Sequence, residues 1–527
     1  MSVLLLQPPA LKPAAPPLGL AVLCGYLRHR KVAVRAFDAN LAAYRYLLRA
    51  ETLAAGAPLE PGVRVKRALR HAESAWQQLS SSAILASFPR YQSAVEHLNV
   101  ALGIYRGPSG QERLTLGDYR HGVLTEFVLA DLKRAATGDS PTLFREFFEG
   151  ELLPKRVVRQ ARLIALSINY RHQLLPAFEL AGLLRRELPG LRLVAGGGML
   201  TSWRSVLESQ PEALAPFDHV IFGPGEEPLA ELARGTIPAE FFLRGGAELA
   251  FEADFSDLPA CDYLSPEPVL PLTGSRGCYW QRCLFCPEAV TPTHPYRCCS
   301  PAEVADRLLI LARRWGVRFF HFTDNALPLP VLRSLAARRQ SLGGLYWYGF
   351  VRFEPALADQ QLLSDLAAAG CRMLQLGLES GSQAVLDRLA KGTRVEAASA
   401  VLRALQRAGI ASYVYVMFGT PGETEQERLA TLDFLEQHAD AIGFLNVAIM
   451  NLPHQSQLAD GRPGAETPPA ERGLYLTGPA ERDRRGQARR FIQQRLLASP
   501  PLRTIIGRTP PLFTSDHAVF FAASDGS

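Results

Sequence analysis

The sequence predicts an α/β protein in which a doubly wound parallel sheet precedes a partial (β/α)6 barrel. Two observations predict this fold class. Short apolar runs alternate with helical stretches in both halves of the 527 residues, a pattern typical of parallel strands joined by helices. After position 271, six such units follow one another within about 180 residues, and each βα unit needs roughly 30. With 47% hydrophobic and 20% charged residues, the chain has the composition of a globular protein of two or three domains.

The first sheet is expected within residues 1–240. Its strand-like runs are SVLLLQ, VAVRAFD, RLIALSIN, LRLVAGGGM and HVIFGPGEE, at 2–7, 32–38, 162–169, 191–199 and 219–227. A proline-rich loop follows the first run at 8–17, and helices are expected near 18–30 and 176–187. Residues 41–160 have a mostly helical pattern without an interpretable motif, and they predict an insertion or cap on this domain.

The barrel is expected at 271–453, after a proline-rich and acidic connector at 241–270. Its strand-like runs lie at 271–275, 317–324, 345–352, 372–379, 412–419 and 441–449. In such barrels the functional side chains lie at the carboxyl ends of the strands, where the polar residues of these runs are found. Residues 454–527 are rich in proline, glycine and arginine, and predict a C-terminal cap with one helix near 480–498.

Charge and cysteine usage narrow the class of protein. The net charge of +6 comes from scattered arginines rather than a lysine tract, which indicates a solvated face and not a nucleic-acid partner. The N-terminal apolar run ends at Pro8, too early for a signal sequence, and no run approaches the ~20 apolar residues of a membrane span. Eight clustered cysteines indicate a reducing cytoplasm and metal chemistry rather than a disulfide framework.

The stretch GCYWQRCLFC places Cys278, Cys283 and Cys286 just after the first barrel strand. Three thiolates can hold three irons of a [4Fe–4S] cluster and leave the fourth iron open to another molecule. The alternative is a structural zinc site completed by Cys298 or Cys299. The cysteines alone do not decide between the two.

The ordered motifs of the barrel resemble the radical SAM superfamily, whose signature is a CxxxCxxC loop with an aromatic residue before the last cysteine. Here Phe285 fills that place, and the first gap is one residue longer. FTDNALP, GLESGSQ and MFGTPGET follow where the family contacts S-adenosyl-L-methionine (SAM), and Arg352 closes the third strand, where a salt-bridge role is the alternative. The resemblance assigns to SAM Phe285, Thr323, Asp324, Asn325, Arg352, Glu379, Ser380, Gly419, Pro421 and Gly422.

The N-terminal half resembles the cobalamin-binding domain of the B12-dependent radical SAM subclass. The segments that carry this resemblance include SINY, VAGGGMLTSW and VIFGPGEEPLAELA, and glycines at strand ends let the backbone approach a ligand. The DxHxxG motif, whose histidine binds cobalt elsewhere, is absent. A sheet without a ligand is the alternative. The resemblance assigns to cobalamin Ser167, Gly196, Gly197, Gly198, Gly223, Gly225 and Glu226.

These resemblances imply an enzyme that uses a [4Fe–4S] cluster, SAM and cobalamin, with an external electron donor of the flavodoxin or ferredoxin type. The implied reaction is methyl transfer to an unactivated carbon. A rearrangement or cyclisation without methyl transfer is the alternative, and a non-catalytic zinc-stabilised binding protein is an alternative of another class. Small-molecule, lipid and peptide substrates all remain open.

Overall fold

A computed structural model describes residues 2–107, 109–236, 238–246, 252–454, 456–459, 475–476 and 478–524. The chain divides into two compact units. The first covers Met1–Pro268, and the second begins at Val269 and comprises the described residues from there on. Parts of the expected connector and cap lie outside the described residues. The domain limits expected from the sequence remain a prediction.

The first unit is built on a six-stranded parallel sheet in the order β2-β1-β5-β6-β7-β8. Its strands are β1 (Val3–Gln7), β2 (Val34–Asp38), β5 (Leu163–Ser167), β6 (Arg192–Gly196), β7 (His219–Phe222) and β8 (Phe242–Arg244). All five residues of β1 are buried, as expected of a strand covered on both faces. The chain moves outward from β1 to β2 and then returns to β5 on the other side, so the order of strands reverses between β1 and β5.

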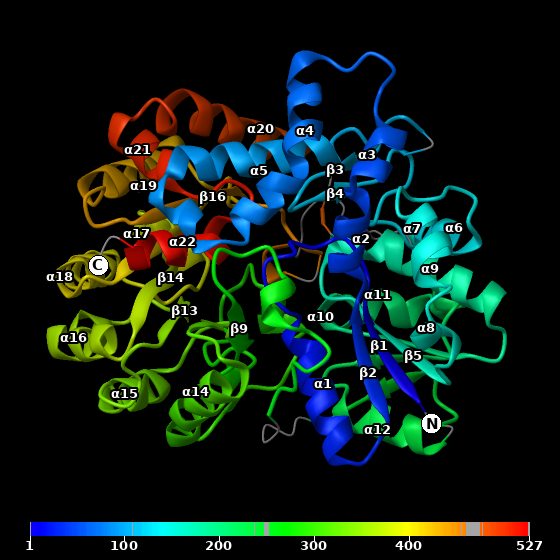
Figure 1. The fold of residues 1–527 in the computed structure, drawn as a ribbon. Coiled ribbons are helices and arrows are strands. Elements are labelled where there is room, and N and C mark those ends of the chain that lie inside the picture. Colours follow the sequence, from blue (N-terminus) through cyan, green and yellow to red (C-terminus); the bar gives the residue numbers. More distant parts are fainter. Residues whose placement is uncertain are drawn as a thin grey trace. The chain divides into compact units, whose positions relative to one another are not determined.

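Helices flank this sheet and follow the strands as expected (Figure 1). They are α1 (Leu18–His29), α9 (Leu174–Glu187), α10 (Gly198–Ser202), α11 (Arg204–Ser209) and α12 (Glu226–Arg234). Helix α9 is buried on nearly every side, because the inserted segment covers the side that faces away from the sheet. Gly182 is needed there, since a Cβ at this position would lie 1.8 Å from the carbonyl oxygen of Ala136.

The insertion holds most of the helices of the first unit. They are α2 (Ala39–Leu47), α3 (Ala50–Gly56), α4 (Val63–Leu79), α5 (Phe88–Leu102), α6 (Leu129–Thr137), α7 (Arg145–Phe147) and α8 (Arg156–Arg159), with a small hairpin of β3 (Arg113–Leu114) and β4 (Tyr119–Arg120). Helix α2 begins at the Asp38 side chain, which accepts a hydrogen bond from the amide of Leu41. Helices α4 and α5 pack along each other.

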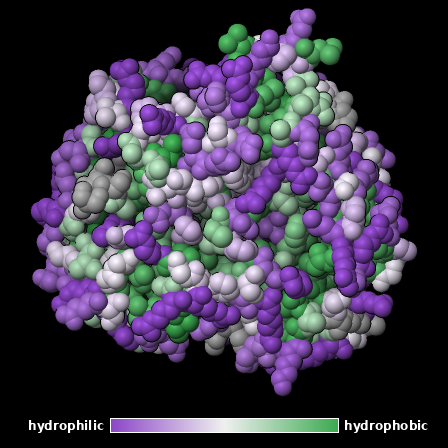
Figure 2. All heavy atoms as spheres, viewed as in Figure 1, coloured by the Kyte–Doolittle hydropathy of each residue, from purple (hydrophilic) through white to green (hydrophobic). Residues whose placement is uncertain are grey.

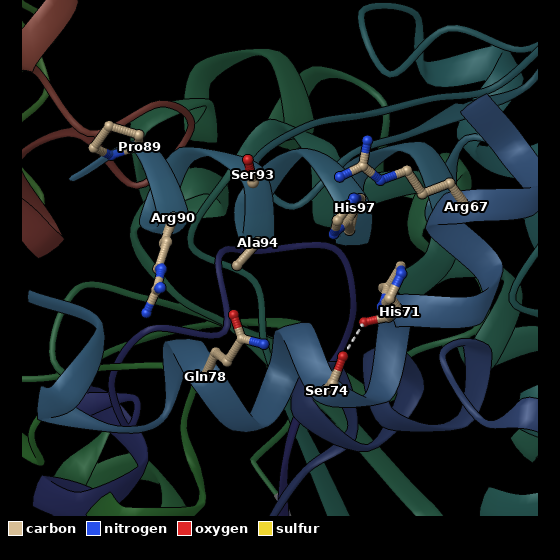
Figure 3. A pocket seen from close by; sticks show the side chains of 9 residues that line it. All are labelled: Arg67, His71, Ser74, Gln78, Pro89, Arg90, Ser93, Ala94 and His97. Atoms are coloured by element: carbon tan, nitrogen blue, oxygen red, sulfur yellow. Dashed lines mark hydrogen bonds between the residues drawn. The ribbon is translucent and has the colours of Figure 1, made fainter. Parts of the chain in front are cut away.

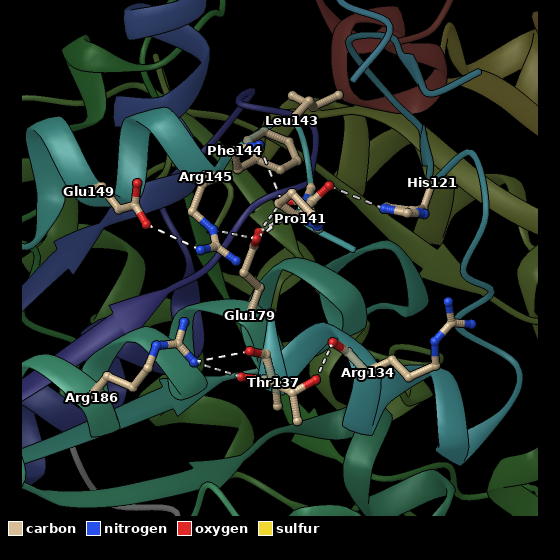
Figure 4. Close-up of polar contacts among 12 residues, drawn as sticks. His121, Arg134, Thr137, Pro141, Leu143, Phe144, Arg145, Glu149, Glu179 and Arg186 are labelled. Atoms are coloured by element: carbon tan, nitrogen blue, oxygen red, sulfur yellow. Dashed lines mark hydrogen bonds and ion pairs between the residues drawn. The ribbon is translucent and has the colours of Figure 1, made fainter. Parts of the chain in front are cut away.

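A buried carboxylate fastens the insertion to α9 (Figure 4). Glu179 is fully buried, and it accepts hydrogen bonds from the amide and hydroxyl of Thr142 and from Nε of Arg145 at 2.8 Å. Burial raises the pKa of Glu179, and its hydrogen bonds to Thr142 and Arg145 lower it. This network ties a polar loop to an otherwise apolar helix.

The segment expected as a connector is part of the first unit. It contributes β8, and its carboxylates Asp254 and Asp257 form ion pairs with Arg28 of α1 at 2.7 and 2.6 Å. The hydroxyl of Tyr263 donates to Asp38 at 2.8 Å. The apolar pattern could not reveal these long-range polar contacts.

The second unit is an open sheet of six parallel strands in the order β16-β15-β14-β13-β12-β9. The strands are β9 (Val269–Leu272), β12 (Phe319–Phe322), β13 (Tyr346–Val351), β14 (Cys371–Glu379), β15 (Ala411–Phe418) and β16 (Phe444–Ile449). Strands β9 and β16 are not paired with each other, so the barrel is partial. The predicted fold class, a doubly wound sheet followed by a partial barrel, is confirmed.

The helices of the barrel lie outside its strands (Figure 1). They are α14 (Pro301–Trp315), α15 (Leu329–Ala337), α16 (Gln360–Ala368), α17 (Gln383–Arg388), α18 (Val395–Ala408) and α19 (Glu425–Gln437). In α18 the buried positions Ala398, Val401, Leu402 and Leu405 follow the helical period, and the helix ends at Gly409 with φ +69°. Helix α19 begins with a capping box.

The C-terminal segment packs onto the barrel with α20 (Pro479–Phe491), α21 (Pro500–Arg508) and α22 (Thr514–Ser524). Helix α22 contacts β13, β14 and β15. The ring of Phe520 lies 4.9 Å from that of Phe319, which begins β12, and His517 is fully buried. Helix α22 therefore covers the amino end of the barrel strands, opposite the end where functional residues are expected.

The visible surface is mostly hydrophilic, with small green areas scattered among purple ones (Figure 2). Within the described part of the chain, no helix is long and apolar enough to cross a membrane.

Candidate radical SAM site

The cysteine loop is held at both ends by a two-stranded hairpin that the sequence did not predict. Strand β10 (Ser275–Arg276) pairs in antiparallel fashion with β11 (Arg297–Cys298), and the loop with the short helix α13 (Pro287–Val290) runs between them. Gly277 has φ +71°, and a Cβ there would lie 2.6 Å from the carbonyl oxygen of His294. The hairpin fixes where Cys278 leaves the barrel wall.

Asp324 anchors this hairpin from the end of β12. Its carboxylate is 3% exposed, and it accepts hydrogen bonds from the amides of Gly274 and Ser275 at 2.9 and 2.5 Å and from the hydroxyl of Ser275 at 2.6 Å. Burial raises the pKa of Asp324 to about 6 against these hydrogen bonds. The sequence assigned this carboxylate to SAM, whereas the structure engages it in holding the cysteine loop.

The three thiols of the loop influence one another electrostatically. The pKa of Cys286 is raised to about 11, mainly by burial and in smaller part by the neighbouring Cys283 and Cys278. Burial also raises the pKa of Cys283, while Lys391 and Arg352 lower it. In the described residues no three His, Cys, Asp or Glu side chains converge on a single metal ion. A [4Fe–4S] cluster needs no such convergence, because each thiolate binds a different iron. The donor set fits a cluster.

The long first gap of the loop carries Trp280. Its indole Nε1 donates to the carbonyl oxygen of Ala390 at 3.1 Å, and Gln281 takes φ +49° to complete the turn. A Cβ at Gly392 would lie only 2.0 Å from the indole ring, so glycine is required where the ring docks. Trp280 therefore packs on the segment that follows α17.

Arg352 lies under this tryptophan at the end of β13. Its guanidinium carbon is 4.4 Å from the centre of the Trp280 ring, its Nη2 donates to the carbonyl oxygen of Lys391, and its Nη1 lies 4.0 Å from Sγ of Cys283. Lys391 in turn donates to Glu379 at 2.8 Å and lies 5.9 Å from the Phe285 ring. Four sequence-assigned residues are thus brought together: Cys283, Phe285, Arg352 and Glu379.

The other residues assigned to SAM, at the ends of β12 and β14, differ in how accessible they are to a ligand. Thr323 and Asn325 are exposed, and Asn325 hydrogen-bonds to Glu288. Ser380 is fully buried, and its hydroxyl is shared with Thr431 at 2.9 Å. Glu379 has φ +66°, and the pairing of β14 with β15 shifts beside it. The geometry leaves Glu379 and Thr323 better placed than Ser380 to meet a ligand.

The turn after β15 contains a buried carboxyl group that the sequence analysis missed. Glu423 accepts a hydrogen bond from the amide of Gly419 at 2.6 Å, and its Oε1 has no partner among the described residues. Burial raises the pKa of Glu423 to about 7. Gly419 and Gly422 have φ +71° and +75°, and the buried Pro421 lies between them. The signal available in the sequence was the acidic residue immediately after TPG.

Cobalamin residues assigned from the sequence lie at the carboxyl edge of the first sheet. Ser167 ends β5 and Gly196 ends β6, while Gly223 follows β7 and Gly225 precedes α12, which Glu226 begins. Ligands of such sheets bind at this edge, where the strand order reverses. Gln7 ends β1 at that reversal, and its buried Oε1 has no partner among the described residues. An unpaired buried acceptor at this place fits a bound ligand.

Two side chains that the sequence analysis did not assign shape the same edge. Gln173 is fully buried, accepts from the amides of Asn169 and Tyr170, and donates to the carbonyl oxygen of Pro8 at 2.8 Å. Asn169 accepts from the amide of Gly198 at 3.0 Å. Gly197 has φ +118°, and a Cβ there would clash with the backbone of Ile168. These contacts fix the loops after β1, β5 and β6 relative to one another.

A cavity of about 320 Å³ lies between α4 and α5 of the insertion (Figure 3). Its lining includes Arg67, Arg90 and the stacked rings of His71 and His97, whose centres are 5.3 Å apart. None of the residues assigned to a cofactor lines it.

Residues 272–435 match the model of the radical SAM superfamily. An uncharacterised methyltransferase of Pyrococcus horikoshii is 25% identical over 31% of this chain and 36% of its own length. Tryptophan 2-C-methyltransferase of Streptomyces laurentii is 27% identical over 39% and 37%. Anaerobic magnesium-protoporphyrin IX monomethyl ester cyclase of Synechocystis is 23% identical over 52% and 58%. The chain spans between about a third and three fifths of the length of these relatives.

Solved structures share the fold of both units. The radical S-adenosylmethionine methyltransferase TsrM of Kitasatospora setae has 17% identity and a TM-score of 0.53 over 87% of this chain and 74% of its own. The cobalamin-dependent S-adenosylmethionine radical enzyme OxsB has 14% identity and a TM-score of 0.56 over 93% and 66%. Residues 272–435 therefore form a radical SAM domain, and the chain as a whole is similar in fold to TsrM and OxsB.

Proposed function

We propose that the protein is a cobalamin-dependent radical SAM methyltransferase that acts on an unactivated carbon. The observation that carries the proposal is the loop of three thiols at the carboxyl end of the partial barrel, in a chain whose other unit presents glycines and an unpaired buried acceptor at the edge of a doubly wound sheet. A radical SAM domain implies SAM and a [4Fe–4S] cluster. The proposal of cobalamin as a second cofactor is supported by the likeness in fold to TsrM and OxsB, whose structures contain cobalamin.

Different residues of the barrel would bind the cluster and SAM. Cys278, Cys283 and Cys286 would ligate three irons, and Thr323 and Glu379 would face SAM. When bound, the cluster supplies an electron for cleavage of SAM and cobalamin supplies a methyl group. The protein would orient these groups, and Asp324 fixes the hairpin from which the cysteine loop begins.

The first unit would hold cobalamin without a histidine beneath the cobalt. Ser167, Gly196 and Gly198 lie where the backbone can approach a large planar ligand, and Gln7 offers an unpaired acceptor. A low-potential electron donor and a small-molecule substrate complete the proposed reaction, in the reducing cytoplasm that the cysteine usage indicates.

A second candidate is a cyclisation or rearrangement without methyl transfer. The Synechocystis cyclase favours it, because that match covers more of this chain than either methyltransferase match does. Transfer of a deuterated methyl group from SAM to cobalamin or to product separates the two candidates.

The test is anaerobic reconstitution of the full chain with iron and sulfide, followed by incubation with deuterated SAM, cobalamin and reductant. Mass spectrometry then measures methionine, 5′-deoxyadenosine and methylcobalamin. Cys283→Ala should lose iron and all SAM turnover, whereas Cys261→Ala, which removes an exposed thiol outside the loop, should retain both. A chain that binds zinc, assembles no cluster and leaves SAM intact would refute the proposal.

A further inference from the structure

Arg352 is a buried cation without a carboxylate partner. It is 8% exposed and forms no ion pair among the described residues, and its Nε has no hydrogen-bond acceptor there. The nearby Lys391 differs, because Glu379 neutralises it at 2.8 Å. Burying an unpaired charge is costly, so a position of this kind indicates that a negative group completes it.

The sulfur of Cys283 is the polar group that the Arg352 guanidinium faces within the loop, with Nη1 4.0 Å from Sγ. The contact is weak for a neutral thiol. Ligation of iron makes this sulfur a thiolate, and donors to charged acceptors bind more closely and about twice as strongly. The missing negative partner of Arg352 is therefore the cluster ligand itself.

Trp280 holds the guanidinium in this place and covers it. The ring lies 4.4 Å from the guanidinium carbon, and its own nitrogen is fixed to the carbonyl oxygen of Ala390. A cation packed on an indole ring is stabilised by the ring electrons and separated from water, which strengthens its effect on a neighbouring charge. Trp280 lies in the gap between Cys278 and Cys283, so the cysteine loop itself carries the ring that covers the guanidinium.

We propose that Arg352 is a positioning residue of the cluster that favours its one-electron reduction, and that Trp280 shields it for this purpose. The inference rests on the proposed function, because it requires the cluster. Reduction of the [4Fe–4S] cluster from 2+ to 1+ adds one electron beside Cys283, and a fixed positive charge stabilises the added negative charge. Hydrogen bonds to the sulfurs, net charge and exposure to solvent are the known determinants of such potentials.

The test is a redox titration of the reconstituted full chain with dithionite, followed by the EPR signal of the reduced cluster in the absence of SAM. In Arg352→Gln we expect the equilibrium constant for reduction to fall about tenfold, a shift of about 59 mV to more negative potential for a one-electron couple. SAM affinity should change little. Arg282→Gln is the matched control, because this exposed arginine of the same loop lies 5.2 Å from the Trp280 ring.

The outcomes separate the inference from the function on which it rests. A wild-type chain without a cluster overturns both. A wild-type cluster whose potential Arg352→Gln leaves unchanged, with SAM affinity lost, overturns the inference alone and makes Arg352 a SAM ligand. If Arg352→Gln fails to assemble the cluster, Arg352→Lys decides: retained iron with a potential near wild type supports the charge role, and loss of iron in this variant too overturns it.

Discussion

Replacing Asp324 should impair assembly of the iron–sulfur cluster, because its carboxylate anchors the cysteine loop and does not itself bind SAM. In Asp324→Ala, the buried amides of Gly274 and Ser275 lose their acceptor, at about 1–3 kcal/mol each. The Ser275 hydroxyl also loses its partner, but it can rotate to another. A local cost of about 2–6 kcal/mol is enough to unfold a hairpin of two residue pairs, and the cysteine loop begins at this hairpin.

Asp324→Asn should lie between wild type and alanine, because the amide keeps one acceptor and turns a donor toward the two amides. The assay is the content of iron and sulfide after anaerobic reconstitution, with hydrogen exchange over 274–286 as a second measurement. We expect less than half of the wild-type iron in Asp324→Ala, and faster exchange confined to that segment. Asp306→Ala is the control, since it removes an exposed carboxylate on α14 that pairs with Arg338, outside the cysteine loop.

The competing interpretation, that Asp324 binds SAM, predicts the opposite pair of results. Full iron content in Asp324→Ala, normal exchange in the hairpin and a weakened affinity for SAM would refute the anchoring role.

Three further predictions concern the rest of the chain. Glu179→Gln should lower the free energy of unfolding of the first unit by about 3–5 kcal/mol in urea. The control Glu149→Gln removes an exposed partner of the same Arg145 and should lower it by at most about 1 kcal/mol. Equal losses in the two variants would contradict a structural role for the buried Glu179 carboxylate. Burial raises the pKa of Glu112 from 4.5 to about 7, so the folded state holds the proton that the unfolded state releases, and stability falls as pH rises through this window, by up to about 3 kcal/mol. Glu112→Gln should flatten this slope in melting temperatures measured from pH 4.5 to 7, and an unchanged slope would show that another group causes it. Gly392→Ala should displace the Trp280 indole and quench or shift its fluorescence, an effect that should be absent when Trp280 is already phenylalanine.

Much of the candidate site was predictable because its residues follow strands of an apolar pattern. The apolar pattern put Cys278, Glu379 and Gly419 at the carboxyl ends of parallel strands, which meet at one edge, and the resemblance to the radical SAM superfamily singled them out there. The roles of individual residues were harder to predict than their positions in the fold. Nothing local distinguishes Asp324 as an anchor or Ser380 as a buried hydroxyl, because both depend on partners about 50 residues away.

Sequence alone determined the order of the two folds, the strands that build them and the three-cysteine loop, because hydrophobic period and motif spacing are local properties. Only the tertiary structure decided which side chains surround the cysteine loop. The stacking of Trp280 on Arg352, the approach of Arg352 to Cys283 and the position of α22 at the amino end of the barrel join segments distant in the chain. Such contacts follow from how elements pack, and packing is decided by the whole fold rather than by any one stretch of residues.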